Sequence, residues 1–197
     1  GLYDYWEMMR KHPRCAGGFL WDLADEGLKR LDQNGMIDNQ GNWAADGIVG
    51  PHFEKEGSYY SIKEIWSPVI VLEKSIDRNF NGTFTVENRY DFLNLNTCKF
   101  VWKQVKFPAQ ADAKGMNKII KQGEVKGSDM AAKTSGKLNL NTKIDPQADA
   151  LFLTAIDYRG EEIWRWSFAL PKENEVLKVA GNAPTTNKSD SLLIVSE

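Results

Sequence analysis

The feature that most constrains the fold is a change in the spacing of apolar residues near residue 68. Before this point apolar residues recur every three or four positions, and after it they alternate with polar residues. A period near 3.6 is typical of amphipathic helices, whereas a period of two is typical of half-buried β-strands. In "GTFTVENRYDF" the alternation places four apolar residues on one face: Phe84, Val86, Tyr90 and Phe92. The sequence therefore predicts a mixed fold, α/β at the start and antiparallel β afterwards.

Seven short strands are predicted in the second part of the chain. Their ranges are 68–76, 82–92, 98–107, 117–126, 137–144, 150–158 and 161–170. Short alternating strands separated by turns indicate an antiparallel sandwich of the immunoglobulin-like type. In the last strand, one face carries Trp164, Trp166, Phe168 and Leu170, and we expect the sandwich core to bury it. The strand at 98–107 is apolar on both faces, so we expect residues 1–67 to cover its outer face.

Two helices are predicted in the first 67 residues. The first carries an apolar face of Leu2, Tyr5, Trp6 and Met9 and ends at His12-Pro13. The second begins at Gly57-Ser58 and ends before Pro68. Between them, the polar loop "KRLDQNGMIDNQGNW" holds the turn signals Asn34-Gly35 and Gln40-Gly41.

Both ends of the sequence predict that the chain is a piece of a longer protein. The first helix begins at residue 2 without a capping side chain. Residues 171–190 are polar and rich in turn formers, typical of a linker, and "SLLIVSE" is predicted to be a strand. We expect three parts, at residues 1–67, 68–170 and 171–197.

Composition excludes several classes of partner. The 197 residues are 42% hydrophobic and 26% charged, with a net charge of −2, so nothing attracts the chain to nucleic acid or anionic membranes. No apolar run approaches the roughly 20 residues that span a bilayer. Cys15 and Cys98 match no metal or redox spacing, and we expect two buried free thiols. His12 and His52 form no metal or catalytic constellation, and His12 is expected to serve the helix end.

The stretch "GGFLWDLADEGL", residues 17–28, combines two glycines, an apolar run and three acids. This pattern predicts a short buried strand, Gly18 to Trp21, that opens into a polar cavity carrying Asp22, Asp25 and Glu26. The three acids have two interpretations. They could form an acid/base pair, or they could cap and hydrogen-bond a loop.

Two segments resemble a known family. "YWEMMRKHPRCAGGFLWDLADEGLKRLDQNG" resembles the final strand region of the catalytic barrel in glycoside hydrolase family 2, in its β-galactosidase branch. "WAADGIVGPHFEKEGSYYSIKEIWSPV" resembles the segment that carries the last barrel helix and enters the next domain. The resemblance implies that residues 1–67 are the truncated end of a TIM barrel and 68–170 an immunoglobulin-like sandwich. Residues 171–197 would then lead into a further domain.

The resemblance also implies roles for individual residues. Trp21 would form an aromatic wall for the galactosyl ring, with Asp22 beside it in the substrate site. Asp46 stands where the family usually has an asparagine that bonds a sugar hydroxyl beside a monovalent cation, and Trp43 would lend that cation its backbone carbonyl. A carboxylate only accepts hydrogen bonds, so Asp46 is a departure from the family. The alternatives are core packing for Trp21 and loop structure for Trp43 and Asp46.

The reactive groups of such an enzyme are missing from this sequence. Retaining glycosidases use two carboxylates, a nucleophile and an acid/base. The family places both, and its divalent-metal ligands, in motifs that this sequence lacks. We therefore expect a parent enzyme that cleaves terminal β-galactosides with Mg²⁺ and Na⁺ bound, and a chain that is inactive alone. Exposed strand edges would favour self-association of the isolated chain. A periplasmic parent fits a polysaccharide-degrading relative, but the sequence does not decide the compartment.

A second hypothesis is a free-standing β-sandwich module that binds carbohydrate or another partner. It predicts oligosaccharide binding by the chain alone, weakened by replacement of Trp164 or Trp166.

Overall fold

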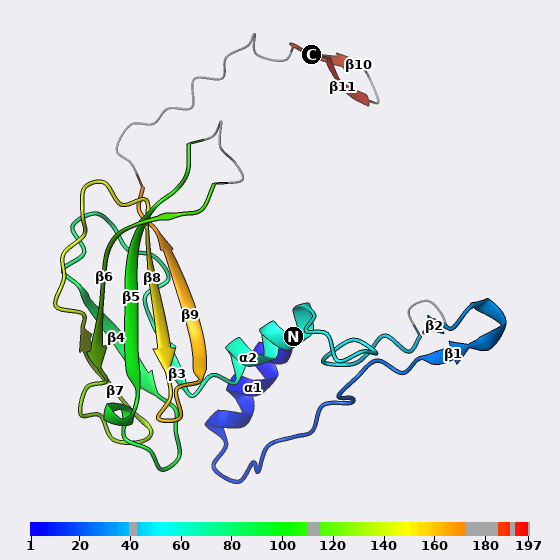
Figure 1. The fold of residues 1–197 in the computed structure, drawn as a ribbon, viewed down its shortest axis with the longest axis horizontal. Helices are drawn as coiled ribbons and strands as arrows, with labels where there is room; N and C mark the ends of the chain where they lie inside the picture. The colour runs from blue at the N-terminus through cyan, green and yellow to red at the C-terminus, as the bar shows by residue number, and fades with distance from the viewer. Residues whose placement is uncertain (40–42, 110–114, 172–184, 190–191, 197) are drawn as a thin grey trace.

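The computed structural model describes residues 1–39, 43–109, 115–171, 185–189 and 192–196, and it consists mainly of antiparallel β-sheets (Figure 1). Two helices precede the strands of the sandwich, α1 (Leu2–Lys11) and α2 (Gly57–Ile65), close to where the sequence predicts them. His12 caps the end of α1, as predicted, and its N–H donates to the Met9 carbonyl. Within the described ranges, no helix is long and apolar enough to cross a bilayer.

The seven predicted strands all form and make two sheets. Three strands form the first sheet, in the order β3 (Val69–Val71), β4 (Thr83–Asn88) and β7 (Thr134–Asn139). Four form the second, in the order β6 (Lys118–Lys126), β5 (Lys99–Lys106), β8 (Ala150–Ile156) and β9 (Glu162–Ala169). All the pairings are antiparallel. This order is consistent with the predicted immunoglobulin-like sandwich.

The core lies between the two sheets. Phe84 on β4 stacks on Phe168 on β9, with ring centroids 4.9 Å apart. Trp102 on β5 is also buried, and Gly123 on the neighbouring strand β6 leaves room for its indole, because a Cβ at Gly123 would meet that ring. Alternation along the strands thus places large apolar side chains inside, as the sequence predicts.

The predicted apolar faces are correct in the middle of the strands and fail at some of their ends. Phe92 is 95% exposed, contrary to the prediction, because β4 ends at Asn88. The Asn88 side-chain amide donates to the carbonyls of Leu93, Met130 and Ala131, so the chain turns out of the strand before Phe92. On β9, Phe168 and the following Leu170 are buried, Trp166 packs against the core from a partly buried position, and Trp164 is only partly buried.

The outer face of the four-stranded sheet is not covered by residues 1–67, contrary to the prediction. Val101, Phe152 and Ile156 line an open groove of about 430 Å³ on this face. The helices lie instead beside the edge strands β3 and β9 (Figure 1). Apolar residues on both faces of β5 therefore do not indicate which element, if any, packs on the outer face.

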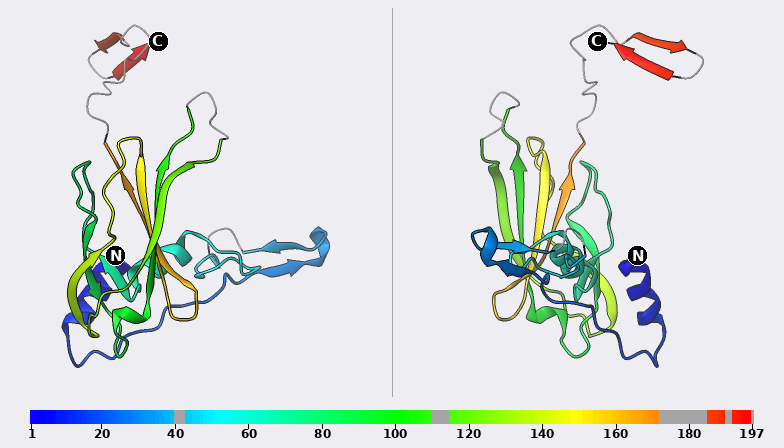
Figure 2. Two further views of the ribbon diagram at one scale, coloured as in Figure 1. Left: turned by 60° about the vertical axis from the view of Figure 1, so that its left-hand side comes forward. Right: turned by 90° about the vertical axis from the view of Figure 1, so that its right-hand side faces the viewer.

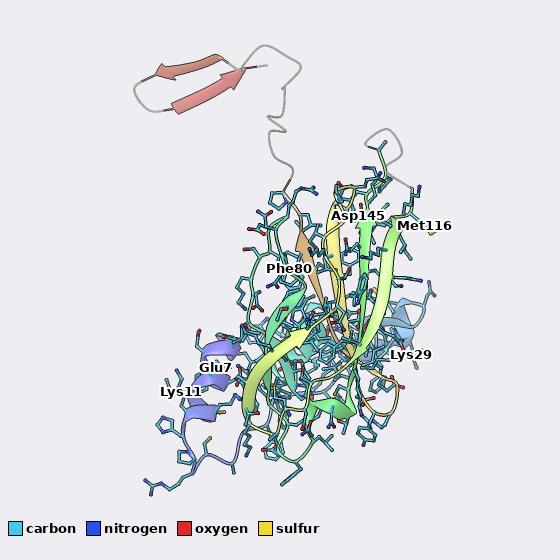
Figure 3. The ribbon with its side chains drawn as sticks, turned by 90° about the vertical axis from the view of Figure 1, so that its left-hand side faces the viewer. Glu7, Lys11, Lys29, Phe80, Met116 and Asp145 are labelled. Atoms are coloured by element: carbon cyan, nitrogen blue, oxygen red, sulfur yellow. The ribbon has the colours of Figure 1, made fainter. Side chains whose placement is uncertain are left out.

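A cluster of ion pairs joins α1 to β4 and the residue after it. Arg89 contacts Glu7 on α1 at 2.8 Å and Glu87 on β4 at 2.9 Å. Arg10 on α1 contacts Glu87 at 3.1 Å. Figure 3 shows Glu7 on the side of α1 next to the sandwich. Since α1 contains no fully buried residue, we expect these ion pairs to contribute to the attachment of α1 to the sandwich.

Two hairpins complete the described structure. β1 (Leu28–Arg30) pairs with β2 (Met36–Asp38), and this hairpin extends away from the sandwich (Figures 1 and 2). The predicted Asn34-Gly35 turn joins its strands, after a 3-10 turn at Leu31–Gln33, with both turn residues in positive-φ conformations. Strand β10 (Thr185–Ser189) pairs with β11 (Leu192–Ser196), so "SLLIVSE" does form a strand. The predicted Gln40-Gly41 turn and most of the predicted linker lie outside the described residues.

Candidate functional site

The predicted buried strand Gly18 to Trp21 does not form. This segment is extended but belongs to no sheet, and the side chains of Phe19 and Trp21 are 104% and 81% exposed. A buried parallel strand needs hydrogen-bonding neighbours on both edges, and residues 17–21 have no such neighbour among the described residues. The prediction of a strand opening onto a polar cavity is therefore wrong for this chain as described.

The acids that follow this segment lie beside the loop at 44–49. Backbone hydrogen bonds run from Ile48 to the Asp22 carbonyl at 3.0 Å and from Val49 to the Leu23 carbonyl at 3.0 Å. The N–H of Glu26 donates to the carbonyl of Ala44, also at 3.0 Å. A parallel bridge between Ala24 and Val49 completes this contact. The segments 22–26 and 44–49 thus form one backbone-bonded unit.

Asp25 organises this unit. Its carboxylate accepts a hydrogen bond from the N–H of Gly47 at 2.8 Å, and its own N–H donates to the Val49 carbonyl. Only glycine fits at position 47, because a Cβ there would overlap the backbone at Ala24 and Asp25. The Ser58 hydroxyl on α2 donates to the Ile48 carbonyl at 3.0 Å, which ties the unit to the helix. This geometry supports the loop-bonding interpretation of Asp25 over an acid/base role.

The residues implied by the family resemblance lie on or next to this unit. Asp46 precedes Gly47 and is exposed, and Trp43 precedes Ala44 and is 89% exposed. Trp21 is joined to Asp22 by a cis peptide bond. Because its indole is open to solvent, Trp21 is not a core residue here. One side-chain oxygen of Asp22 is buried and has no hydrogen-bond partner among the described residues.

The structural role of Gly47 was not predicted from the sequence. The Asp46-Gly47 pair is a common turn dipeptide and could have indicated a turn at this position. Its position beside Asp25, however, depends on a contact across the loop that no local pattern encodes.

The described residues contain no group of three His, Cys, Asp or Glu side chains that could hold a metal ion. The backbone N–H of His52 donates to the Glu54 carboxylate at 2.8 Å. Cys98 is a buried free thiol, and burial raises its pKa. Cys15 is also free but exposed, so the prediction that it is buried is wrong. It lies in the loop after α1, where no core is available to cover it.

Comparison with known proteins places this arrangement in a family. Residues 84–180 match the profile of β-galactosidase, domain 4, which covers most of the sandwich. The sandwich belongs to the β-galactosidase domain 4 family. The resemblance inferred from the two segments before residue 68 and the match to the sandwich therefore agree.

Curated relatives share this family name. A β-galactosidase of Priestia megaterium is 30% identical over 112 residues, 51% of this chain and 10% of that protein. One from Photobacterium profundum is 24% identical over 156 residues, 72% of this chain and 15% of that protein. One from Aeromonas hydrophila is 42% identical over 110 residues, 49% of this chain and 10% of that protein. The chain thus spans a small part of the length of these β-galactosidases.

Proposed function

We propose that this chain is the portion of a retaining β-galactosidase that closes the catalytic barrel and continues into the following sandwich. The observation that carries the proposal is the contrast between two surfaces. The sandwich has a core of buried apolar side chains, whereas residues 19–39 and Trp43 expose several large apolar side chains and bury none of them. These are Phe19, Trp21, Leu23, Leu28, Leu31, Met36 and Trp43. Contiguous exposed apolar surface is typical of an interface.

In this proposal, residues 1–67 supply the last barrel strand and its helices, and residues 17–21 become a strand when neighbouring strands are present. The extended backbone and unpaired edges of this segment are compatible with that change. Trp21 and Asp22 would then lie at the carboxyl end of a barrel strand, where barrel enzymes place their sites.

The substrate in this proposal is a terminal β-galactoside. The indole of Trp21 would pack against the C–H face of the galactosyl ring, and the carboxylates of Asp22 and Asp46 would accept hydrogen bonds from its hydroxyls. The backbone bonds between 22–26 and 44–49 hold these residues in one unit, which supports a shared role. The nucleophile and the acid/base would come from other parts of the parent, so the isolated chain would hydrolyse nothing.

The cation implied by the family needs more donors than these residues offer. The carbonyl of Trp43 and the carboxylate of Asp46 are hard oxygen donors, which suit Na⁺ or Mg²⁺ chemically. Both residues are exposed, and Asp46 belongs to no group of three His, Cys, Asp or Glu side chains among the described residues. We therefore propose that this chain contributes at most part of a cation site.

A chimaeric enzyme tests the proposed function. The matching segment of the Photobacterium profundum β-galactosidase would be replaced by residues of this chain, and hydrolysis of a nitrophenyl galactoside measured. We expect the chimaera to hydrolyse the galactoside and the isolated chain to show no hydrolysis. A folded chimaera without activity, or hydrolysis by the isolated chain, would contradict the proposal.

The same exposed surface has a consequence for the isolated chain. We expect it to self-associate through residues 17–39 and Trp43, because burying several large apolar side chains is favourable at roughly 25 cal/mol per Å². In sedimentation experiments, we expect a variant in which Phe19, Trp21 and Trp43 are replaced by serine to be a monomer. If the unmodified chain is a monomer at high concentration, this expectation fails.

A further inference from the structure

A groove of about 620 Å³ lies where the two sheets of the sandwich part, between α2 and the edge strand β9. Trp164 and Trp166 line it from β9, and Ser61 and Glu64 line it from α2. Lys74, just after β3, lines the opposite side. The groove therefore brings together three parts of the chain that are far apart in the sequence. Pockets of this size accommodate small organic ligands.

The two tryptophans form a rigid aromatic surface. Both are partly buried, and Trp166 packs against the sandwich core. Phe168, two residues further along the strand, is 4% exposed and stacks on Phe84, which fixes the strand beneath the groove. An aromatic surface that is held by a core and still reaches a groove can pack against the C–H faces of a sugar ring at little cost in conformational entropy.

The polar groups of the groove suit an uncharged ligand. The side chains of Glu64 and Lys74 make no hydrogen bond or ion pair with any described residue, so one acceptor and one donor remain available. The other charged side chains of the lining already have partners: Arg165 contacts Glu162 at 2.9 Å, and the Glu73 carboxylate accepts from the Thr85 N–H at 2.8 Å. Arg89 contacts Glu7 at 2.8 Å. Because the lining carries charges of both signs, the groove favours neither a polyanion nor a polycation. Hydroxyl groups both donate and accept, which matches this pair.

We propose that this groove binds a short, uncharged oligosaccharide, with Trp164 and Trp166 under the sugar rings and Glu64 and Lys74 bonding hydroxyls. The site is separate from the unit that carries Trp21, Asp22 and Asp46, and its existence does not depend on the proposed function. The choice of a galactoside as probe does rest on that function.

Calorimetric titration of the full chain tests the proposal, with lactose and cellobiose as probes. We expect saturable binding of at least one of them in the millimolar range. Trp164→Ala should weaken binding at least roughly tenfold, and Glu64→Gln, on an exposed position of α2, should weaken it a fewfold without affecting folding. The matched control is Phe92→Ala, an aromatic side chain that is 95% exposed and lines no part of the groove, which should bind like the unmodified chain.

Absence of saturable binding of both sugars would overturn the proposal. So would binding that survives both Trp164→Ala and Glu64→Gln. A third variant, Trp21→Ala, separates this outcome from the proposed function. If Trp21→Ala abolishes binding while the groove variants do not, the sugar binds at the unit around Asp25 and the groove proposal is wrong. The activity of the chimaeric enzyme is independent of this result.

Discussion

Replacing Arg89 with methionine is the sharpest test of how α1 is attached to the sandwich. The Arg89 side chain is 10% exposed, and its partners Glu7 and Glu87 are 24% and 27% exposed. Breaking a buried ion pair costs about 3–5 kcal/mol, whereas a fully exposed pair contributes about 0–1 kcal/mol. Because this cluster is partly buried, we expect Arg89→Met to lower the free energy of unfolding by about 2 kcal/mol.

Urea unfolding followed by tryptophan fluorescence measures this change, and hydrogen exchange reports on α1 directly. The control is Lys99→Met, because Lys99 and its partner Glu124 are 49% and 65% exposed. The control should change the free energy of unfolding by less than about 1 kcal/mol. In a double-mutant cycle with Glu7→Gln, the coupling to Arg89 should be favourable, and amides of α1 should exchange faster in either variant. If Arg89→Met costs no more than Lys99→Met, the cluster does not hold α1 in place.

Three further predictions concern the sandwich. Phe84→Ala removes the stack between the sheets and should cost about 3–5 kcal/mol in urea unfolding; a loss below about 1 kcal/mol would show that the core is not packed as described. A thiol reagent should label the exposed Cys15 rapidly and the buried Cys98 only after unfolding, and equal rates would contradict the burial of Cys98. The backbone N–H of Glu161 donates to the Asp157 carboxylate and helps to hold the pKa of Asp157 below its ordinary value of 3.8. The ionised Asp157 therefore stabilises the folded state fully above pH 3.8, and this stabilisation is lost as the pH falls through the lowered pKa. Titration of the Asp157 carboxyl by NMR should give a midpoint below 3.8, and a midpoint at or above it would refute this sign.

The sandwich could be predicted from the sequence because its determinants are local. Alternating apolar residues such as Phe84 and Val86 define a strand and its buried face without reference to any partner strand. The order of the strands and the exposure of Phe92 could not be predicted in the same way. The exposure of Phe92 depends on hydrogen bonds from the Asn88 side chain to the carbonyls of Leu93 and Met130. The bond to Met130 joins residues that are far apart in the sequence, so no local pattern predicts it.

The candidate site was predicted less well because its determinants are not local. The run before Trp21 has the composition of a buried strand, but a strand in a parallel sheet exists only with neighbours on both edges. The described residues supply none, so Phe19 and Trp21 are exposed. The predicted acids do lie beside Asp46, but the bond from Gly47 to Asp25 that brings them together crosses the loop.

The groove beside Trp164 illustrates the same limit. The alternation of β9 predicted that Trp164 and Trp166 share a face with Phe168, and it treated that face as core. The face is core at Phe168, which is 4% exposed, but it is only partly buried at Trp164, which lines the groove together with residues of α2. Sequence periodicity gives the face of a strand but not the point along it where packing stops.

The central claim, that this chain carries part of a galactoside-binding wall, is tested most directly by one kinetic measurement in the chimaeric β-galactosidase. Trp21→Ala should lower kcat/KM for a nitrophenyl galactoside roughly ten- to hundredfold, because an aromatic contact to the sugar is lost. Phe92→Ala should leave kcat/KM unchanged. Equal kcat/KM for Trp21→Ala and the unmodified chimaera would contradict the claim.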